Sequence, residues 1–254
     1  MLFVRISTIF VVMKRAVVLG ASSGIGMEVA KLLLADGWKI GVASRRTDLL
    51  MTLKKEAPDR VEVETIDVNS DEAEDLLLSL IAVIGGMDLF FYAPGIGYQN
   101  PTLEKELEER TVQTNAMGFT RMVGFAFRYM ATHGGGHIAA ITSIAGTKGL
   151  GAAPSYSATK AFQNTYMQAL EQQAHMRGLA IRFTDLRPGF VGTALLGDDP
   201  KFPMLLRKED VAREMIEAIR NKEHIRVIDW RWRIVTAMWR RIPRWIWRNL
   251  KIVK

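Results

Sequence analysis

Short apolar runs alternate with longer amphipathic stretches over most of this 254-residue chain. The apolar runs predict strands, which we place at residues 15–19, 39–43, 61–66, 88–92, 137–143, 180–186 and 225–228. Between them, apolar positions that recur every three or four residues predict helices at residues 25–35, 48–56, 71–84, 103–132, 155–177 and 208–221. We expect the fourth of these helices to be broken or bent near Gly118 and Gly124. Because apolar strands alternate with helices, the pattern predicts a single α/β domain with a parallel sheet that is covered on both faces.

The end of the chain follows a different pattern. From Val235 onward, apolar residues recur at helical spacing with basic residues between them, and Pro243 would bend this helix or begin a second one. Residues 225–254 contain nine Lys or Arg and one acid, a net charge of +8, so the total of +7 leaves the preceding residues at −1. Five of the six tryptophans also lie in this segment. We therefore separate a domain at residues 13–229 from a basic, aromatic, amphipathic tail at residues 230–254.

Three interpretations of the tail remain open. Tryptophan and arginine on an amphipathic helix suit a membrane interface, with the indole at headgroup level and the guanidinium facing anionic lipid. Alternatively, the tail packs on a partner subunit or covers a pocket of its own domain. Nucleic-acid binding is the least favoured interpretation. We expect peripheral attachment to the inner face of a membrane.

The N-terminal segment and the composition narrow the class of protein. Residues 1–12 are apolar, with no basic segment before them and no small-residue cleavage site after them, which argues against a signal peptide. We treat them as an extension, with Met13 as an alternative initiator. No apolar run reaches the roughly 20 residues that span a bilayer, so we expect a cytoplasmic protein. The chain has no cysteine and its four histidines lack metal-ligand spacing, so we expect no metal site.

A glycine-rich loop follows the first predicted strand. Gly20, Gly24 and Gly26 suit a tight turn, close approach to a phosphate, and close packing of a helix on a strand. The helix that follows would point its free N–H groups at an anion. A glycine-rich loop can be only a turn, but its position in a strand–helix–strand unit favours dinucleotide binding. The residues that we assign to this site are Gly20, Ser22, Ser23, Gly24, Ile25 and Gly26.

The end of the second predicted strand indicates which dinucleotide is bound. An NAD site usually has an acidic residue there to bind the ribose 2′-hydroxyl group. This chain has Ser44, followed by Arg45 and Arg46. Guanidinium groups pair well with phosphate, which favours NADP(H), although a solvated basic turn would have the same sequence.

Tyr156 and Lys160 are four residues apart in a predicted helix, so they lie on the same face. An ammonium group close to a phenol favours the phenolate and lowers its pKa, and such a pair can act as a general acid and base. The spacing alone is common on solvated helix faces. It becomes informative beside a site for a dinucleotide.

With these motifs the chain resembles the short-chain dehydrogenase/reductase family over roughly residues 14–228. Besides the glycine-rich loop, the motifs that match in order are Asp67 with Val68, Asn115, Ser143, Tyr156 with Lys160, and the run from Pro188 to Thr193. The resemblance implies a doubly wound parallel sheet of Rossmann type. It also implies a homodimer or homotetramer that forms through the helices near residues 104–130 and after Tyr156.

The resemblance also implies roles for these residues. Tyr156 would exchange a proton with the substrate oxygen, Lys160 would lower the pKa of Tyr156 and bind the nicotinamide ribose, and Ser143 would hydrogen-bond the substrate oxygen. Asn115 would position a water that links Lys160 to solvent. The cofactor would further contact Asp67, Val68, Ala93, Gly95, Pro188, Gly189, Val191 and Thr193. The chain departs from the family at Tyr92-Ala93-Pro94-Gly95, where two asparagines are common, which puts the bracing of the central strands in doubt.

Three loops would enclose the substrate, at residues 95–101, 144–154 and 194–206. They and Phe190 supply mainly apolar side chains, namely Ile96, Tyr98, Leu150, Phe190, Leu195, Leu196, Phe202, Met204 and Leu205. We therefore predict an NADP(H)-dependent oxidoreductase that acts on a lipophilic carbonyl compound or secondary alcohol. Epimerisation and dehydration are alternative chemistries. A non-catalytic dinucleotide-binding or membrane-associated scaffold protein is the alternative class.

Overall fold

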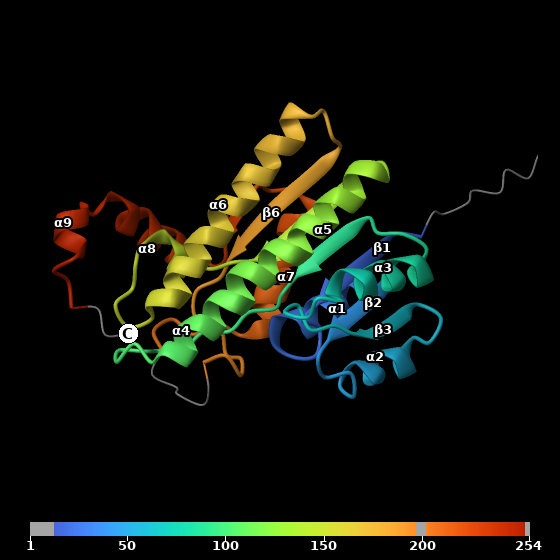
Figure 1. Cartoon of the computed structure of the whole chain (residues 1–254), viewed down its shortest axis with the longest axis horizontal. Helices are drawn as coiled ribbons and strands as arrows, with labels where there is room; N and C mark the ends of the chain where they lie inside the picture. Colours follow the sequence, from blue (N-terminus) through green and yellow to red (C-terminus); the bar gives the residue numbers. More distant parts are fainter. Residues whose placement is uncertain (1–12, 197–201, 252–254) are drawn as a thin grey trace, which may run out of the picture.

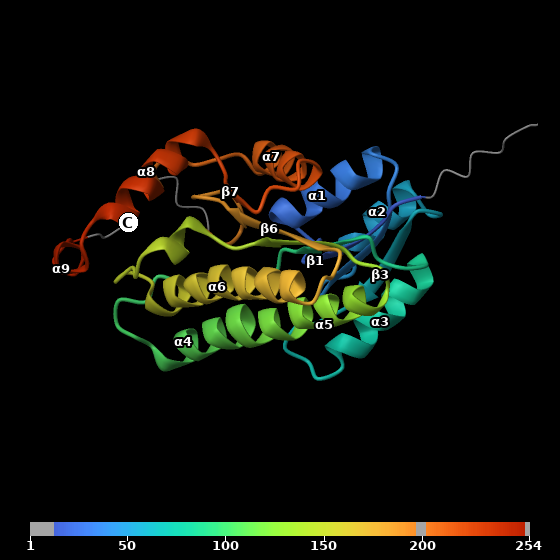
Figure 2. The ribbon, with the colours of Figure 1, turned by 90° about the horizontal axis from the view of Figure 1, so that it is seen from above.

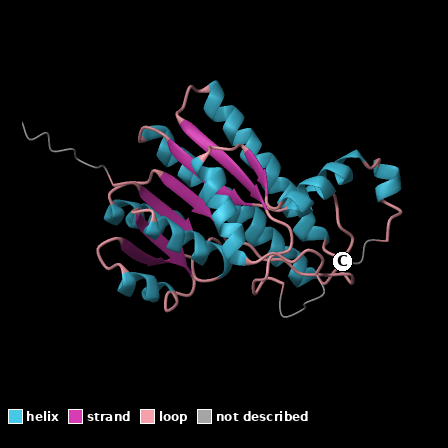
Figure 3. Ribbon diagram, turned by 180° about the vertical axis from the view of Figure 1, so that it is seen from behind, coloured by secondary structure: helices cyan, strands magenta, loops and turns pink. Residues whose placement is uncertain are grey.

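The computed structural model describes residues 13–196 and 202–251, so the predicted extension at residues 1–12 lies outside the described part. A seven-stranded parallel sheet forms its centre (Figure 3). In sheet order the strands are β3 (Val61–Thr65), β2 (Lys39–Ser44), β1 (Arg15–Leu19), β4 (Leu89–Tyr92), β5 (Gly136–Ile141), β6 (Ile181–Arg187) and β7 (Ile225–Val227). The predicted α/β fold with a doubly wound parallel sheet is confirmed.

Helices cover both faces of the sheet (Figures 1 and 2). One apolar layer includes α1 (Gly24–Ala35), α2 (Leu50–Glu56) and α7 (Lys208–Arg220), and the other includes α3 (Ala73–Ile84), α5 (Phe119–Thr132) and α6 (Pro154–Met176). Successive side chains of a strand point to opposite faces. In β4, Phe90 and Tyr92 accordingly enter one layer while Leu89 and Phe91 enter the other.

The order of the strands reverses between β1 and β4. From β1 the chain proceeds outward through β2 and β3, then returns beside β1 and continues through β5, β6 and β7. The first loops after β1 and β4 diverge at this point, which leaves a crevice at the carboxyl ends of the strands. The backbone N–H of Ala93 donates to the carbonyl oxygen of Leu19 at 3.1 Å, so both loops start side by side.

The long helical region between β4 and β5 is interrupted at one of the two predicted places. It consists of α4 (Lys105–Val112), a π-helical turn at Gln113–Gly118 and α5, and the turn ends at Gly118. The predicted break at Gly124 is wrong, because Gly124 lies within α5. A side chain at Gly124 would place its Cβ 3.3 Å from the Tyr166 hydroxyl of α6, so this glycine permits close packing of two helices.

The C-terminal tail contains two helices that lie beside the loop after β5 (Figure 1). Helix α8 (Trp230–Arg241) begins five residues before the predicted start at Val235, because the Asp229 side chain accepts a hydrogen bond from the backbone N–H of Arg231 and caps it. Pro243 directly precedes a second short helix, α9 (Arg244–Trp247), so the prediction that this proline begins a second helix is confirmed. Lys148 donates to the carbonyl oxygen of Ile242 at 3.0 Å, and the Trp247 indole donates to that of Gly149 at 2.7 Å.

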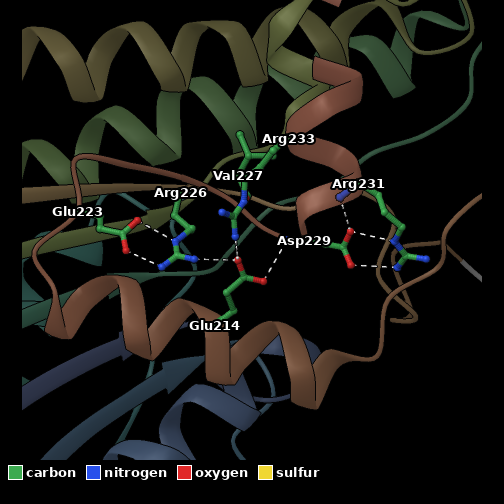
Figure 4. Close-up of polar contacts among 7 residues, drawn as sticks. All are labelled: Glu214, Glu223, Arg226, Val227, Asp229, Arg231 and Arg233. Atoms are coloured by element: carbon green, nitrogen blue, oxygen red, sulfur yellow. Dashed lines mark hydrogen bonds and ion pairs between the residues drawn. The ribbon is translucent and has the colours of Figure 1, made fainter. Parts of the chain in front are cut away.

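A polar network fixes the direction in which the tail leaves the sheet (Figure 4). Glu214 of α7 accepts hydrogen bonds from the guanidinium groups of Arg226 and Arg233 and from the backbone N–H of Asp229. Asp229 has a φ of 70°, a conformation that few residues other than glycine adopt. The Asp229 carboxylate also pairs with Arg231 at 2.9 Å. The tail is therefore attached to the domain through Arg231 and Arg233 near its start as well as by its later contacts.

Candidate active site

The glycine-rich loop brings β1, α1 and the loop after β4 into contact. Gly20 has a φ of 77°, and a Cβ there would lie 2.9 Å from the backbone nitrogen of Pro94. A Cβ on Gly26 would lie 2.4 Å from the carbonyl oxygen of Gly20. Both positions therefore require glycine, and α1 begins at Gly24 with its N–H groups directed at the crevice. This is the geometry expected for a loop that binds phosphate.

The two arginines after β2 lie beside this loop. Arg46 Nη2 donates to the Ser23 hydroxyl at 3.0 Å and approaches that of Ser22 at 3.4 Å. The buried Ser44 hydroxyl accepts from the backbone N–H of Arg46 and turns the chain toward the loop. Arg45 is exposed and lines the same cavity. Both arginines therefore line the cavity at the end of β2, where their guanidinium groups can pair with an anionic group.

Tyr156 and Lys160 lie one turn apart in α6, where Lys160 is buried and Tyr156 is half-buried in the wall of the cavity. The Lys160 ammonium is 5.8 Å from the centroid of the Tyr156 ring, and Ser143 hydrogen-bonds the tyrosine. Burial raises the pKa of Tyr156, and the hydrogen bond with Ser143 lowers it in part. This direction is opposite to that expected from the lysine. A Cβ on Gly97 would lie 2.6 Å from the Tyr156 ring, so glycine leaves room for the ring here.

Burial also lowers the pKa of Lys160, to about 7, against the negative charge of Asp185, which raises it. The ammonium donates to the carbonyl oxygen of Ile141 at 3.2 Å and to Gln163 Oε1 at 2.9 Å. Gln163 Nε2 in turn donates to the carbonyl oxygen of Asn115 at 2.8 Å. The side chain of Gln163 therefore connects Lys160 directly to the backbone of Asn115, whereas we expected Asn115 to position a water that links Lys160 to solvent. The sequence contained one signal for this residue, its position three places after Lys160 on the same helix face.

The side chain of Asn115 performs a different task. Its Oδ1 accepts from the backbone N–H of Ile96 at 2.9 Å, and its Nδ2 donates to the carbonyl oxygen of Ile96 and to Thr159. Asn115 is fully buried in the π-helical turn. It therefore holds the loop after β4 against α6, with Gly95 between Asn115 and Lys160.

The departure from the family at residues 92–95 changes how the central strands are supported. Tyr92 occupies the first position and is fully buried, with its ring 5.0 Å from Phe119 in an edge-on arrangement. Its hydroxyl has no hydrogen-bond partner among the described residues, and burial raises its pKa. Aromatic packing thus replaces polar bracing at this strand end.

These residues surround one cavity of about 1000 Å³. Of the residues that the sequence assigned to the cofactor, only Asn115 does not line this cavity. Those that line it are Gly20, Ser22, Ser23, Gly24, Ile25, Gly26, Ser44, Arg45, Arg46, Asp67, Val68, Ala93, Gly95, Tyr156, Lys160, Pro188, Gly189, Val191 and Thr193. Ser143 also lines it. The arrangement can bind an extended ligand with phosphate at one end and place its other end beside the half-buried Tyr156.

The other side of the cavity is apolar. Of the predicted substrate-side residues, those that line it are Ile96, Tyr98, Leu150, Phe190, Leu195, Leu196, Phe202 and Met204. Leu205 does not line it, and its side chain is exposed. Part of the third loop, residues 197–201, lies outside the described residues.

Helix α8 closes this side of the cavity with Trp232, Val235 and Trp239, which the sequence did not assign to the site. Trp232 is 2% exposed, and a Cβ on Gly189 would lie 2.3 Å from its Nε1. Positions 232, 235 and 239 recur at helical spacing and so share one face. This spacing was the available signal, but it does not reveal what that face covers. The interpretation that the tail covers a pocket of its own domain therefore holds for the inner face of α8.

A doubly wound sheet with a glycine-rich loop at its crevice defines a nucleotide-binding protein of Rossmann type. The sequence model of the short chain dehydrogenase family matches residues 14–202. The chain belongs to the short-chain dehydrogenase/reductase family and is an oxidoreductase of that family.

Two relatives show how far the similarity extends. A glycine betaine reductase of Emericella nidulans is 34% identical over 229 residues, which cover 84% of this chain but only 18% of that longer protein. An uncharacterized oxidoreductase of Myxococcus xanthus is 31% identical over 240 residues, covering 91% of this chain and 93% of the relative.

Solved structures agree with the fold. A serine dehydrogenase in complex with NADP⁺ is 26% identical, with a TM-score of 0.71 over 81% of this chain and 88% of that one. A 3-ketoacyl-(acyl-carrier-protein) reductase from Brucella melitensis, solved with NADH, has a TM-score of 0.76 at 22% identity, covering 85% of this chain and 96% of that one, and shows the fold alone.

The described residues form no helix that is both long and apolar enough to cross a bilayer. They contain no group of three or more histidine or acidic side chains placed to bind a metal ion.

Proposed function

We propose that this protein is an NADP(H)-dependent oxidoreductase that transfers a hydride between nicotinamide and a lipophilic carbonyl compound or secondary alcohol. One observation carries the proposal: a single cavity joins the glycine-rich loop, Tyr156 with the buried Ser143 and Lys160, and an apolar wall. Such a cavity can bind the cofactor and hold a carbonyl group beside a proton donor. A scaffold protein without catalysis would not require this buried group of side chains.

In the reducing direction, each residue has one task. The glycine-rich loop and the residues from Pro188 to Thr193 would hold the cofactor, whose nicotinamide would supply a hydride for the carbonyl carbon when bound. The Tyr156 hydroxyl donates its proton to the carbonyl oxygen, and the Ser143 hydroxyl hydrogen-bonds that oxygen as negative charge develops on it. The Lys160 ammonium stabilises the tyrosinate that is left, and the apolar wall excludes water. The oxidation of an alcohol uses the same groups in reverse.

A substitution at the tyrosine tests this mechanism. Tyr156→Phe removes the proton donor while preserving the ring that packs against Gly97. General acid catalysis contributes about 10²- to 10⁴-fold, so we expect kcat to fall by at least 100-fold on a panel of lipophilic ketones and alcohols. Fluorescence titration with NADPH serves as the control for folding and cofactor binding. Activity that survives this substitution would refute the assigned chemistry.

The preference for NADP(H) rests on charge at the end of β2. Ser44 stands where an acidic residue would bind a ribose 2′-hydroxyl group, and Arg45 and Arg46 flank the glycine-rich loop. The relative solved with NADP⁺ and the one solved with NADH show that both cofactors occur on this fold. The arginines therefore carry this part of the proposal.

Binding titrations with both cofactors test the preference. A charge-assisted hydrogen bond contributes about 1.5–3 kcal/mol, so Arg46→Ala should weaken NADPH binding by about 10- to 150-fold and leave NADH binding nearly unchanged. Arg45→Ala should act in the same direction. Arg213→Ala, at an exposed site on α7, is the control. Equal losses for the two cofactors would exclude a 2′-phosphate contact.

We also propose a homo-oligomer that forms through α4, the π-helical turn and α6. These elements pack against one another and expose Val112, Met117 and Phe162. Exposed apolar side chains that cluster on one face mark an interface. Sedimentation equilibrium should give a dimer or tetramer, which Phe162→Asp together with Met117→Asp should dissociate. A wild-type monomer at micromolar concentration would contradict this proposal.

Finally, we propose that the outer face of the tail attaches the cytoplasmic protein peripherally to the inner face of an anionic membrane. Trp230, Ile234 and Met238 are exposed at four-residue intervals along α8, and Trp245 of α9 is 70% exposed. Arg226, Arg231 and Arg233 pair with acidic side chains, whereas the five cations between residues 240 and 251 pair with no carboxylate of the described residues. Exposed indoles beside unpaired cations suit a surface of anionic headgroups.

Flotation with vesicles tests this attachment. The protein should float with vesicles that contain phosphatidylserine and stay in solution with pure phosphatidylcholine. Trp230→Ser with Trp245→Ser should abolish flotation, whereas Met176→Ser, at an exposed apolar site on α6, should not affect it. If flotation depends on neither the anionic lipid nor the tryptophans, the outer face does not bind the membrane. It would then contact another partner, such as a second copy of the chain.

A further inference from the structure

We infer that Gln163 is a positioning residue that holds Lys160 as an ammonium group beside Tyr156, by connecting it to the backbone of Asn115. This inference rests on the proposed function, because it assigns the support of the lysine in the same site. It differs from the sequence-based expectation, in which Asn115 acts through a water.

The hydrogen bonds fix the orientation of the Gln163 amide. The carbonyl oxygen of Asn115 can only accept, so the Gln163 nitrogen must face it, and the distance between them is 2.8 Å. The Gln163 oxygen must then point the other way, toward the Lys160 ammonium at 2.9 Å, which can only donate. A reversed amide would place donor against donor at one end and acceptor against acceptor at the other.

The surroundings make this contact important for the charge of Lys160. Gln163 and Asn115 are fully buried, and the ammonium has only one other hydrogen-bond acceptor among the described residues, the carbonyl oxygen of Ile141. Titratable groups reach the lysine from two elements. Tyr156 lies on α6, and Asp185 lies on β6, where its carboxylate is paired with Arg187 at 2.5 Å. Since Asp185 is already paired, a neutral acceptor in direct contact has a large share in keeping the lysine charged.

The chemistry of an amide then defines what Gln163 can do. An amide donates and accepts hydrogen bonds but does not exchange protons readily at neutral pH. Gln163 therefore fixes a charge in place and does not transmit a proton from Asn115.

The pKa of the lysine itself is the measurement that tests this inference. The ¹³Cε resonance of Lys160, identified by its absence in Lys160→Arg, is followed as a function of pH in the protein without ligands. Gln163→Met keeps the length of the side chain but removes the acceptor, so the midpoint should move at least one pH unit lower, a tenfold weaker protonation. Gln163→Glu adds a negative acceptor, so the midpoint should move higher. Gln168→Met, at an exposed site on α6, should leave it unchanged.

Turnover supplies a second measurement. In the reducing direction, the alkaline limb of the kcat profile should move to lower pH in Gln163→Met and to higher pH in Gln163→Glu. A merely structural role would lower kcat in both variants without moving the limb in opposite directions. Thermal melting and NADPH titration show whether each variant folds. If Gln163→Met does not fold, Gln163→Glu still tests the inference.

The outcomes separate this inference from the proposed function. If Tyr156→Phe abolishes turnover and the Lys160 midpoint is the same in wild type, Gln163→Met and Gln163→Glu, the role of Gln163 is wrong while the proposed function stands. If Tyr156→Phe retains turnover, the proposed function is wrong, whatever the midpoints show.

Discussion

The contact between Gly189 and Trp232 gives a sharp test of whether α8 is part of the cavity wall. An alanine at position 189 would place its Cβ 2.3 Å from Nε1 and 2.4 Å from Cε2 of the indole. These distances are about 1 Å shorter than ordinary contacts between carbon and its neighbours. The indole has little room to retreat, because it is 2% exposed and its ring centroid lies 5.6 Å from that of Phe190.

The size of the effect follows from these contacts. Forcing one extra carbon into a packed site costs about 1–3 kcal/mol, so Gly189→Ala should lower the free energy of unfolding by that amount. In a Trp232→Ala background the obstacle is gone. The same glycine-to-alanine change should then be neutral or stabilise by up to about 1 kcal/mol, because it restricts the unfolded chain. The two substitutions should therefore show a coupling energy of about 1–4 kcal/mol.

Urea unfolding of the wild type, both single variants and the double variant measures this coupling. Gly192→Ala is the matched control in the same loop, since a Cβ there would meet only the carbonyl oxygen of Leu206, at 3.7 Å. Limited trypsin digestion at the arginines of the tail should be faster in Gly189→Ala than in the control. If Gly189→Ala costs as much in the Trp232→Ala background as in the wild type, α8 does not pack against this loop as described.

Three other substitutions have defined outcomes. Burial lowers the pKa of His137 from 6.5 to about 4, so the unfolded chain binds its proton more tightly, and stability is lost as the pH falls through this range. In urea unfolding, the free energy of unfolding of the wild type relative to His137→Gln should decrease by up to about 3 kcal/mol as the pH falls from 7 to 4. A difference between the two proteins that does not depend on pH would contradict this prediction. Tyr92→Phe removes a buried hydroxyl that has no partner among the described residues, so it should be neutral or raise the thermal midpoint; a loss above about 1 kcal/mol would show that the hydroxyl is satisfied. Glu214→Ala leaves the backbone N–H of Asp229 without its acceptor and should cost about 1–3 kcal/mol and speed proteolysis of the tail, whereas Glu217→Ala on the same helix should do neither.

The sequence was sufficient where local chemistry determines the structure. Strands that are apolar on both faces, a glycine-rich loop after the first of them, and Tyr156 four residues before Lys160 each have a direct physical meaning. They predicted the sheet, the crevice and most of the residues that line it. The interruption in the long helical region was predicted near Gly118 for the same reason.

The rest depends on contacts between residues far apart in the chain. Gly124 is suited to a break by its intrinsic preference, but the contact with Tyr166 of α6 uses it for packing. Gln163 could be placed on the face of Lys160, but only the structure shows that the carbonyl oxygen of Asn115 orients its amide. The inner face of α8 has an ordinary apolar pattern, and its place over Gly189 is set by the junction at Asp229 and Glu214.

Helix α8 has two working faces, since Val235 and Trp239 line the cavity while Ile234 and Met238 point outward. Both faces belong to one helix of twelve residues, so neither can move alone. If the outer face binds a membrane as proposed, a ligand in the cavity and that membrane would both contact this one helix and so act on its docking together. By thermodynamic linkage the two effects are equal: the factor by which the ligand changes the affinity for the membrane is the factor by which the membrane changes the affinity for the ligand.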